Sequence, residues 1–199
     1  MDQEPVTGSA KSVREVPRPV GPPLTAERTE GAERTGPGTV EAIFVGPDGG
    51  APMRRVGTVA AIADHGLEGD RYCDRTGYWS GLDDCQVTLI ESEALDDIAD
   101  QYGVDVSEGQ HRRNIVTRGL SFSALPGRYL RVGNAVLAYD RPRPPCRYIE
   151  SITEPGMARA LAARRGGICV RVVESGNIGV GDLIQVVAPP PHRMVTLAL

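Results

Sequence analysis

Short runs of apolar and β-branched residues recur along the middle of the chain, and each run is bounded by Gly, Pro, Asp or Asn. This pattern predicts strands rather than helices, because β-branched side chains fit a pleated surface and the bounding residues favour turns. The predicted strands are residues 40–45, 56–62, 86–90, 114–117, 129–132, 135–139, 168–173 and 183–187. Short strands at this density are typical of a barrel or a sandwich, so the expected fold class is mainly β with a minor α component.

Two segments interrupt the strands and carry the signals of helices. Residues 92–102 have acids in the first turn, apolar residues at helical spacing and Gly103 as a stop. Residues 153–165 begin with a threonine that can cap a helix, contain an early proline at Pro155 and end on two arginines before Gly166. The sequence therefore predicts two helices among the strands.

The two ends differ in composition from the stretch between them. Residues 1–38 hold six prolines and five glycines but no aromatic residue. Such a segment buries too little apolar surface to offset the entropy lost on ordering, so we expect a disordered tail. Residues 189–199 begin with three prolines and are expected to leave the last strand as a second tail. One domain, residues 39–188, is expected between them.

The overall composition argues against several classes of protein. A formal net charge of -4 argues against a general nucleic-acid binder. No apolar run approaches the length that crosses a membrane, and the N-terminus lacks the apolar segment of a secretory signal, so we expect a cytoplasmic protein with reduced thiols. The single lysine, Lys11, lies in the predicted tail, so the domain cannot bind pyridoxal phosphate covalently as a Schiff base.

Charge is distributed unevenly along the chain. Residues 64–108 hold thirteen acids against two arginines, whereas residues 111–147 hold eight arginines against Asp140 alone. The basic segment suggests a small anionic ligand, most simply a phosphate, because the guanidinium fork matches phosphate oxygens. Alternatively, the acidic and basic segments face each other and neutralise their charges. The sequence leaves both explanations open.

One of the four cysteines has a distinctive setting. Cys146 lies in the run Arg-Pro-Arg-Pro-Pro-Cys-Arg of residues 141–147. Guanidinium groups favour the charged form of a thiol, so Cys146 is a candidate thiolate, and the prolines predict that an extended segment presents it. Cys85 and Cys169 belong to predicted apolar strands and fit small core residues. Cys73, in a polar loop, is either a resolving thiol for Cys146 or an exposed side chain.

Five motifs occur in a particular order along the predicted domain. They are Gly66-Leu67-Glu68-Gly69-Asp70-Arg71, then Val87-Thr88-Leu89-Ile90-Glu91, then Arg112-Arg113-Asn114-Ile115-Val116, then Leu125-Pro126-Gly127 leading through Gly133 to Pro142-Arg143-Pro144-Pro145-Cys146, and Gly166-Gly167-Ile168 leading to Val180-Gly181-Asp182. In this order they resemble the MOSC family, which is named for the C-terminal domain of molybdenum cofactor sulfurase. The resemblance extends from about residue 40 to residue 187.

The resemblance implies a fold and a site. The fold is a strongly bent β-barrel of the MOSC or pyruvate-kinase-barrel-like type with two or three short helices. Cys146 is implied either to carry sulfur as a persulfide or to ligate molybdenum held by the pyranopterin cofactor. The implied cofactor-contacting groups, which include arginines for the pterin phosphate, are Gly69, Asp70, Arg71, Arg112, Arg113, Asn114 and Arg143.

Three functions follow from this resemblance and from the residues. The first is a molybdenum-cofactor oxidoreductase that reduces N-hydroxylated compounds with electrons from a partner protein, with a second subunit of a homodimer closing the site. The second is a metal-free sulfur carrier or sulfurtransferase, in which Cys146 receives persulfide sulfur from a separate pyridoxal-phosphate cysteine desulfurase. The third is a binding module whose arginines hold a phosphorylated small molecule.

Overall fold

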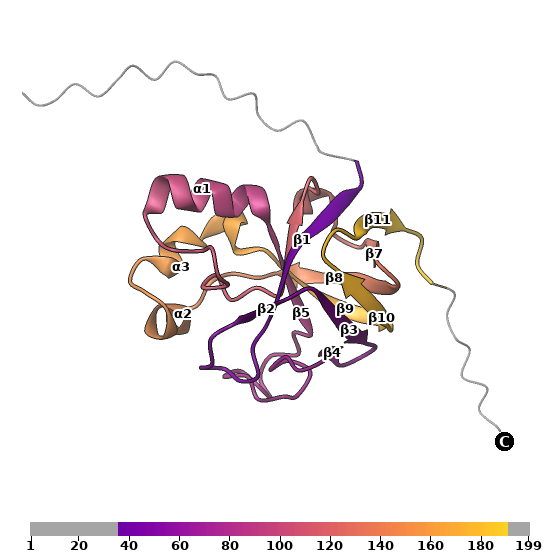
Figure 1. Ribbon diagram of the computed structural model, residues 1–199, viewed down its shortest axis with the longest axis horizontal. Coiled ribbons are helices and arrows are strands. Elements are labelled where there is room, and N and C mark those ends of the chain that lie inside the picture. The colour runs from indigo at the N-terminus through magenta and orange to yellow at the C-terminus, as the bar shows by residue number, and fades with distance from the viewer. Residues whose placement is uncertain (1–35, 191–199) are drawn as a thin grey trace, which may run out of the picture. The chain divides into compact units, whose positions relative to one another are not determined.

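The computed structural model describes residues 36–190, which form a mainly β domain with three short α-helices (Figure 1). The strands are β1 (Gly38–Val45), β2 (Arg54–Val56), β3 (Thr58–Ile62), β4 (Gly66–Leu67), β5 (Val87–Glu91), β6 (Ile115–Arg118), β7 (Tyr129–Val132), β8 (Ala135–Pro142), β9 (Ile168–Glu174), β10 (Gly176–Gly179) and β11 (Leu183–Val187). The helices are α1 (Ser92–Tyr102), α2 (Arg147–Ile152) and α3 (Met157–Ala160), with the 3-10 helices η1 (Phe122–Ala124) and η2 (Ala163–Gly166). The mainly β class predicted from the strand pattern is confirmed.

Seven strands form a closed barrel. Their order around the ring is β11, β7, β8, β9, β5, β6 and β1, and β1 pairs with β11 to close it. Neighbours run antiparallel except β5 and β6, which are parallel. The first residues of β1, Gly38 and Thr39, pair with β11, whereas its last residues pair with β2. The bent barrel that the resemblance implied is therefore confirmed.

Two apolar clusters hold the domain together. The larger one fills the barrel with inward-facing side chains such as Ile43, Leu89 and Val170. The smaller one packs the helices against the outside of the barrel, and it includes Ile98 of α1 and Met157 of α3. The three helices consequently lie together on one side of the strands (Figure 1). Full burial of one such side chain contributes about 1.5–3 kcal/mol, so both clusters fix the segments that lead into the site.

The prediction of a single strand over residues 56–62 is wrong, because the structure has two strands there. The strand is interrupted at Gly57: β2 pairs with the end of β1, whereas β3 pairs with β10 and β4 in a separate three-stranded sheet. The strands β4 and β10 were not predicted. Both contain glycine and few apolar residues, so neither has the run of branched side chains that marks the others.

The first predicted helix is confirmed and the second is wrong. Helix α1 has the predicted bounds and ends at Gly103 in a left-handed conformation with φ of 64°. Over residues 153–165, by contrast, the structure has α3, η2 and irregular backbone. Thr153 follows the end of α2. Gly156, with φ of 95°, interrupts the helical backbone just after Pro155 and precedes α3. The apolar spacing that suggested one long helix comes from Met157 and Leu161, which lie at the start and the C-cap of the short helix α3 and pack in the smaller cluster.

The predicted tails mostly fall on residues 1–35 and 191–199, which lie outside the described residues, so the domain limits remain a prediction. Within the described part of the chain, no helix is long and apolar enough to cross a membrane.

Candidate functional site

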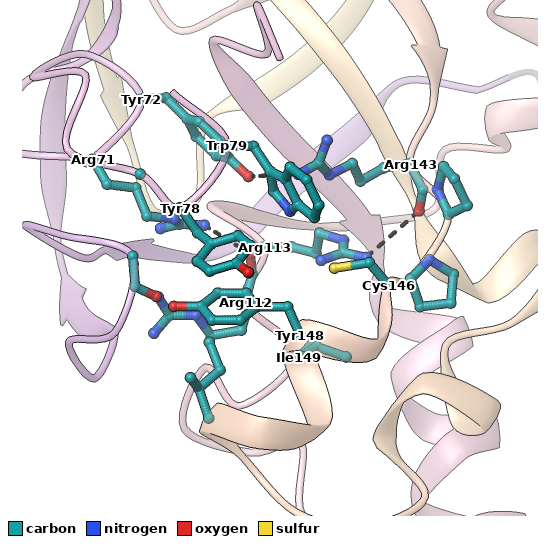
Figure 2. Close-up of a pocket in the computed structure, with 15 residues that line it drawn as sticks. Arg71, Tyr72, Tyr78, Trp79, Arg112, Arg113, Arg143, Cys146, Tyr148 and Ile149 are labelled. Atoms are coloured by element: carbon teal, nitrogen blue, oxygen red, sulfur yellow. Dashed lines mark hydrogen bonds between the residues drawn. The ribbon is translucent and has the colours of Figure 1, made fainter. Parts of the chain in front are cut away.

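Four arginines and Cys146 line a pocket of about 60 Å³, which we call the arginine pocket (Figure 2). The four arginines and Cys146 come from three separate parts of the chain. Arg71 follows β4, Arg112 and Arg113 precede β6, and Arg143 and Cys146 lie between β8 and α2. The other lining side chains are mainly aromatic or apolar, and they include Tyr72, Tyr78, Trp79, Tyr148 and Ile149.

A buried polar network behind the pocket fixes the segments that carry these arginines. The Asp70 carboxylate accepts hydrogen bonds from the backbone N–H of Gly46 (3.0 Å) and of Tyr72 (3.1 Å) and from Nδ2 of Asn114 (2.9 Å). Asn114 also donates to the carbonyl of Phe44 at 3.1 Å and accepts from Thr88. Asp70 and Asn114, implied by the resemblance as cofactor contacts, therefore lie behind the pocket, and neither they nor Gly69 line it.

Arg71 and Arg112 form one side of the arginine pocket. Arg71 pairs with Asp70 at 3.1 Å and donates from Nη2 to the carbonyl of Arg112 at 3.1 Å. The guanidinium of Arg112 donates to the carbonyls of Gly49 and Ala51 and so holds the loop after β1. Burial, and then the charge of Arg71, lower the pKa of Arg112 to about 10, so the group stays charged at neutral pH.

Arg113 lies deeper in the same wall. Its Nε donates to the carbonyl of Gly166 at 2.7 Å, and its Nη1 donates to the carbonyl of His111 at 3.1 Å. Burial lowers its pKa to about 10, which again leaves the group charged. Neither Arg112 nor Arg113 has a carboxylate in direct contact among residues 36–190, so the hydrogen bonds of both buried guanidinium groups go to carbonyl oxygens, and the charge of Asp70 acts on Arg112 only from a distance. Such a site favours an anion.

Arg143 is held by an acid from the other half of the chain. The Asp83 carboxylate accepts hydrogen bonds from Arg141 and Arg143, one on each oxygen. Arg143 also donates to the hydroxyl of Tyr72 at 3.2 Å. The explanation that the acidic and basic segments face each other holds in part, because Asp83 and Asp96 of the acidic segment pair with Arg141, Arg143 and Arg118 of the basic one.

The Asp83 cluster gives a testable pH dependence. Burial raises the pKa of Asp83, but hydrogen bonding and charge from Arg143 outweigh burial and leave this pKa below its ordinary value. The folded chain therefore binds this proton more weakly than the unfolded chain, so the cluster stabilises fully above about pH 4 and less as the pH falls through the lower folded pKa. Asp83→Asn should cost about 1–2 kcal/mol at pH 7.

In urea unfolding, the difference between wild type and Asp83→Asn should shrink below pH 4. The exposed neighbour provides a control, since Asp84→Asn should change the unfolding free energy by less than about 0.5 kcal/mol. A difference that is constant from pH 7 to pH 3 would contradict this account of Asp83.

Cys146 lies in an extended segment, as the prolines before it predicted. Its backbone is extended, with φ of -120° and ψ of 161°, and it directly precedes α2. Figure 2 shows its side chain directed into the pocket together with that of Arg113. Of the three arginines nearest to Cys146 in sequence, only Arg143 lines the pocket, so most of the positive charge near Cys146 comes from distant segments.

Aromatic side chains cover one face of the pocket. Tyr78 stacks on Tyr148 with ring centroids 3.8 Å apart, and Trp79 contacts Tyr78 edge to face. The Arg71 guanidinium lies over the ring of Tyr72 at 4.5 Å. The sequence analysis did not select Tyr148, although its place two residues after Cys146 in the first turn of α2 was a usable signal.

The other three cysteines lie away from the arginine pocket. Cys73 is partly buried and does not line the pocket, and burial with the charge of Asp74 raises its pKa. Cys85 and Cys169 are buried and lie with their sulfur atoms 2.9 Å apart, a contact that the sequence did not predict. Across the described residues, no group of three or more His, Cys, Asp or Glu side chains could hold a metal ion.

Comparison with known proteins agrees with this geometry. A family model described as the MOSC domain matches residues 76–185, more than half of the chain. Similar solved structures include the YuaD protein from Bacillus subtilis, with 17% identity, a TM-score of 0.63, and coverage of 77% of this chain and 97% of that one.

The YiiM proteins from Geobacillus stearothermophilus and Escherichia coli are also similar in structure. The first has 20% identity and a TM-score of 0.58 and covers 76% of each chain. The second has 18% identity and a TM-score of 0.54, with coverage of 76% of this chain and 71% of that one. At these identities the likeness shows the fold, and no curated protein matches. With the family model over residues 76–185, the barrel and the pocket lead to one assignment: the chain belongs to the MOSC domain family.

Proposed function

We propose that this protein binds a small anion in the arginine pocket and that Cys146 carries sulfur there as a persulfide. The observation that supports this most is the pair of buried guanidinium groups, Arg112 and Arg113, that have no carboxylate partner in the described domain. Both groups line the pocket into which the Cys146 side chain is directed, so an anion bound there lies among guanidinium donors. A persulfide on Cys146 is such an anion.

The size of the pocket also favours a small ligand. Its volume of about 60 Å³ is well below the roughly 300–1,000 Å³ of pockets that hold drug-sized molecules. A terminal sulfur atom or a tetrahedral oxyanion needs little space, and the stacked rings of Tyr78 and Tyr148 limit what else can enter. The third function, a module for a phosphorylated molecule, shares this anion site but gives no role to the Cys146 thiol.

The sulfur must come from another protein. Lys11 is the only lysine of the chain, and it lies outside the described domain, so the domain itself offers no amine for a pyridoxal-phosphate Schiff base. In the proposed step the Cys146 sulfur attacks the terminal sulfur of a persulfide on a cysteine desulfurase. The desulfurase thiolate leaves, the new sulfur–sulfur bond forms on Cys146, and the terminal sulfur keeps the negative charge near Arg113.

Mass spectrometry tests this proposal. Incubation with a cysteine desulfurase and cysteine should add the mass of one sulfur atom, and peptide mapping should place it on Cys146. Cys146→Ala should take up none, whereas Cys73→Ala, at a partly buried cysteine outside the pocket, should load like the wild type. Equal loading of Cys146→Ala and wild type would contradict the proposal, as would no loading of the wild type.

A second candidate is the molybdenum cofactor, and the chemistry of the side chains favours it. Cys146 offers a soft sulfur ligand, and Arg112, Arg113 and Arg143 could hold the pterin phosphate. The bound cofactor would supply reduction of N-hydroxylated compounds with electrons from a partner protein. The volume of about 60 Å³ does not fit a whole pyranopterin unless the aromatic face moves, so we derive no step through it.

Metal analysis separates the two candidates. Protein purified from a host that makes the cofactor should contain no molybdenum if Cys146 is only a sulfur carrier. Molybdenum near one per chain that is lost in Cys146→Ala would support the reductase instead. If Cys146→Ala leaves sulfur loading, molybdenum content and phosphate binding all unchanged, only the module for a phosphorylated molecule remains.

A further inference from the structure

Two buried thiols lie in contact close to Asp83 and outside the arginine pocket. Cys85 precedes β5 and Cys169 lies in β9, and their exposed fractions are 4% and 0%. Their sulfur atoms are 2.9 Å apart, with the Cys85 thiol donating to Cys169. This distance is shorter than ordinary non-bonded contacts of about 3.5–4.0 Å and longer than the roughly 2.05 Å of a disulfide bond. A small movement would therefore bring the two atoms to bonding distance.

The surroundings of the pair favour a thiolate on Cys169. In the ladder between β8 and β9, Cys169 lies opposite Arg141, whose guanidinium binds Asp83. The hydrogen bond from Cys85 and the charges of Arg143 and Arg141 lower the pKa of Cys169 against the opposing effect of burial. The same hydrogen bond, together with burial, raises the pKa of Cys85. One sulfur is thus a proton donor and the other a proton acceptor.

Only one cysteine of the pair borders a cavity. Cys85 lines a cavity of about 300 Å³, which we call the Cys85 cavity, together with residues that include Tyr72, Trp79, Gln86 and Arg171. Cys169 does not line it. The volume is at the lower end of the range for small-molecule sites, so a molecule of the size of a small disulfide can approach Cys85 but not Cys169.

We propose that Cys85 and Cys169 form a redox-active dithiol that closes reversibly to a disulfide by exchange with a low-molecular-weight disulfide entering the Cys85 cavity. This goes beyond the proposed function of Cys146 and does not depend on it. The alternative is that both residues are inert core side chains, as their burial alone would suggest. A redox-active dithiol would form a disulfide when a small disulfide is added, whereas inert core thiols would stay reduced.

The exchange has two steps. The Cys85 sulfur attacks one sulfur of the small disulfide and forms a mixed disulfide, while its proton passes to Cys169 and one small thiolate leaves. The Cys169 sulfur then attacks the Cys85 sulfur, loses its proton to the released thiolate, and expels the second small thiolate. Relative to the dithiol, the protein loses two electrons and two protons. One proton passes from Cys169 to the first small thiolate, and the other, which Cys169 released to solvent when it ionised, protonates the second, so the small disulfide becomes two thiols.

The test uses the full wild-type chain, first reduced and then incubated with oxidised glutathione under native conditions. We expect the intact mass of the Cys85–Cys169 product to fall by that of two hydrogen atoms, and proteolysis to release one cross-linked pair of peptides that contain these two cysteines. A dithiol reductant should restore the original mass. Folded protein that forms adducts only at Cys73 or Cys146, with Cys85 and Cys169 still reduced, would overturn the proposal.

Two variants test the direction of entry. Cys169→Ala removes the resolving thiol, so glutathione should accumulate as a mixed disulfide on Cys85. Cys85→Ala should leave Cys169 unmodified in the folded protein, because Cys169 has no exposed surface. If the adduct forms on Cys169 and not on Cys85, or if folded Cys169→Ala gives no adduct on Cys85, the assigned path is wrong. Peptide mapping of the wild-type protein shows whether the Cys85–Cys169 disulfide forms, even if a variant fails to fold.

Discussion

Asp70→Asn is expected to lower the free energy of unfolding by about 3–5 kcal/mol, the range for breaking a buried ion pair from one side. The substitution keeps the shape of the side chain and removes its charge. The Arg71 side chain, which is 6% exposed, would keep its positive charge without a carboxylate to neutralise it. One oxygen would also become an NH₂ group facing donors, because the carboxylate accepts from the backbone of Gly46 and Tyr72 and from Asn114.

Urea unfolding at pH 7 measures this effect. Asp74→Asn is the matched control, because it is the same change four residues later at an exposed side chain, and it should alter the free energy by less than about 0.5 kcal/mol. Similar small effects for the two variants would show that Asp70 does not hold the pocket's supporting network. The slope of unfolding against urea should stay that of the wild type, since the unfolded chain is barely changed.

Arg113→Met is expected to weaken binding of sulfate, used as a probe anion, by about 10- to 100-fold. A charge-assisted hydrogen bond contributes about 1.5–3 kcal/mol, and each 1.4 kcal/mol is a factor of ten in affinity. Trp79, the only tryptophan of the chain, lines the arginine pocket, so its fluorescence can report the titration. Arg113→Lys keeps the charge but loses the fork, and it should recover only part of the affinity.

Arg164→Met provides the control for the loss of one charge. Arg164 lies in η2 and is exposed, so its removal should change sulfate affinity by less than about twofold. Far-ultraviolet circular dichroism should show that Arg113→Met remains folded despite the lost bond to the Gly166 carbonyl. A folded Arg113→Met protein that binds sulfate as tightly as the wild type would refute the anion site.

The fold was predictable where a strand fills the barrel, and less so elsewhere. The strand around Leu89 carries branched side chains on both faces because both are covered, and such runs were recognised. The break at Gly57 was missed because a single glycine within an apolar run does not reveal that the chain changes sheets. The second helix was predicted wrongly because the helical spacing of apolar residues after Met157 suggested one long helix. Pro155 and Gly156 instead interrupt the helical backbone before Met157.

Several of the residues selected from the sequence line one pocket, but their arrangement could not be predicted. Cys146 and Arg143 stood out because cationic residues cluster in residues 111–147, whereas Arg71 was selected only through the resemblance. The sequence could not separate Arg113, which faces the pocket, from Asn114, whose amide turns the other way to bind Asp70. The contact between Cys85 and Cys169 could not be predicted, because the two residues are 84 positions apart in sequence. Only the pairing of β5 with β9 brings their segments together.

The closure of the barrel has a consequence for how the protein is made. The ring is sealed by β1 and β11, through the two pairs Gly38 with Ile184 and Thr39 with Leu183. During synthesis β1 leaves the ribosome before β11, so these two pairs cannot form until β11 has been made. Until then the open edge of β1 presents unpaired backbone N–H and C=O groups that can pair with a strand of another chain. A nascent or truncated chain that stops before residue 183 leaves this edge open, so chaperones that shield strand edges would matter most for this protein late in its synthesis.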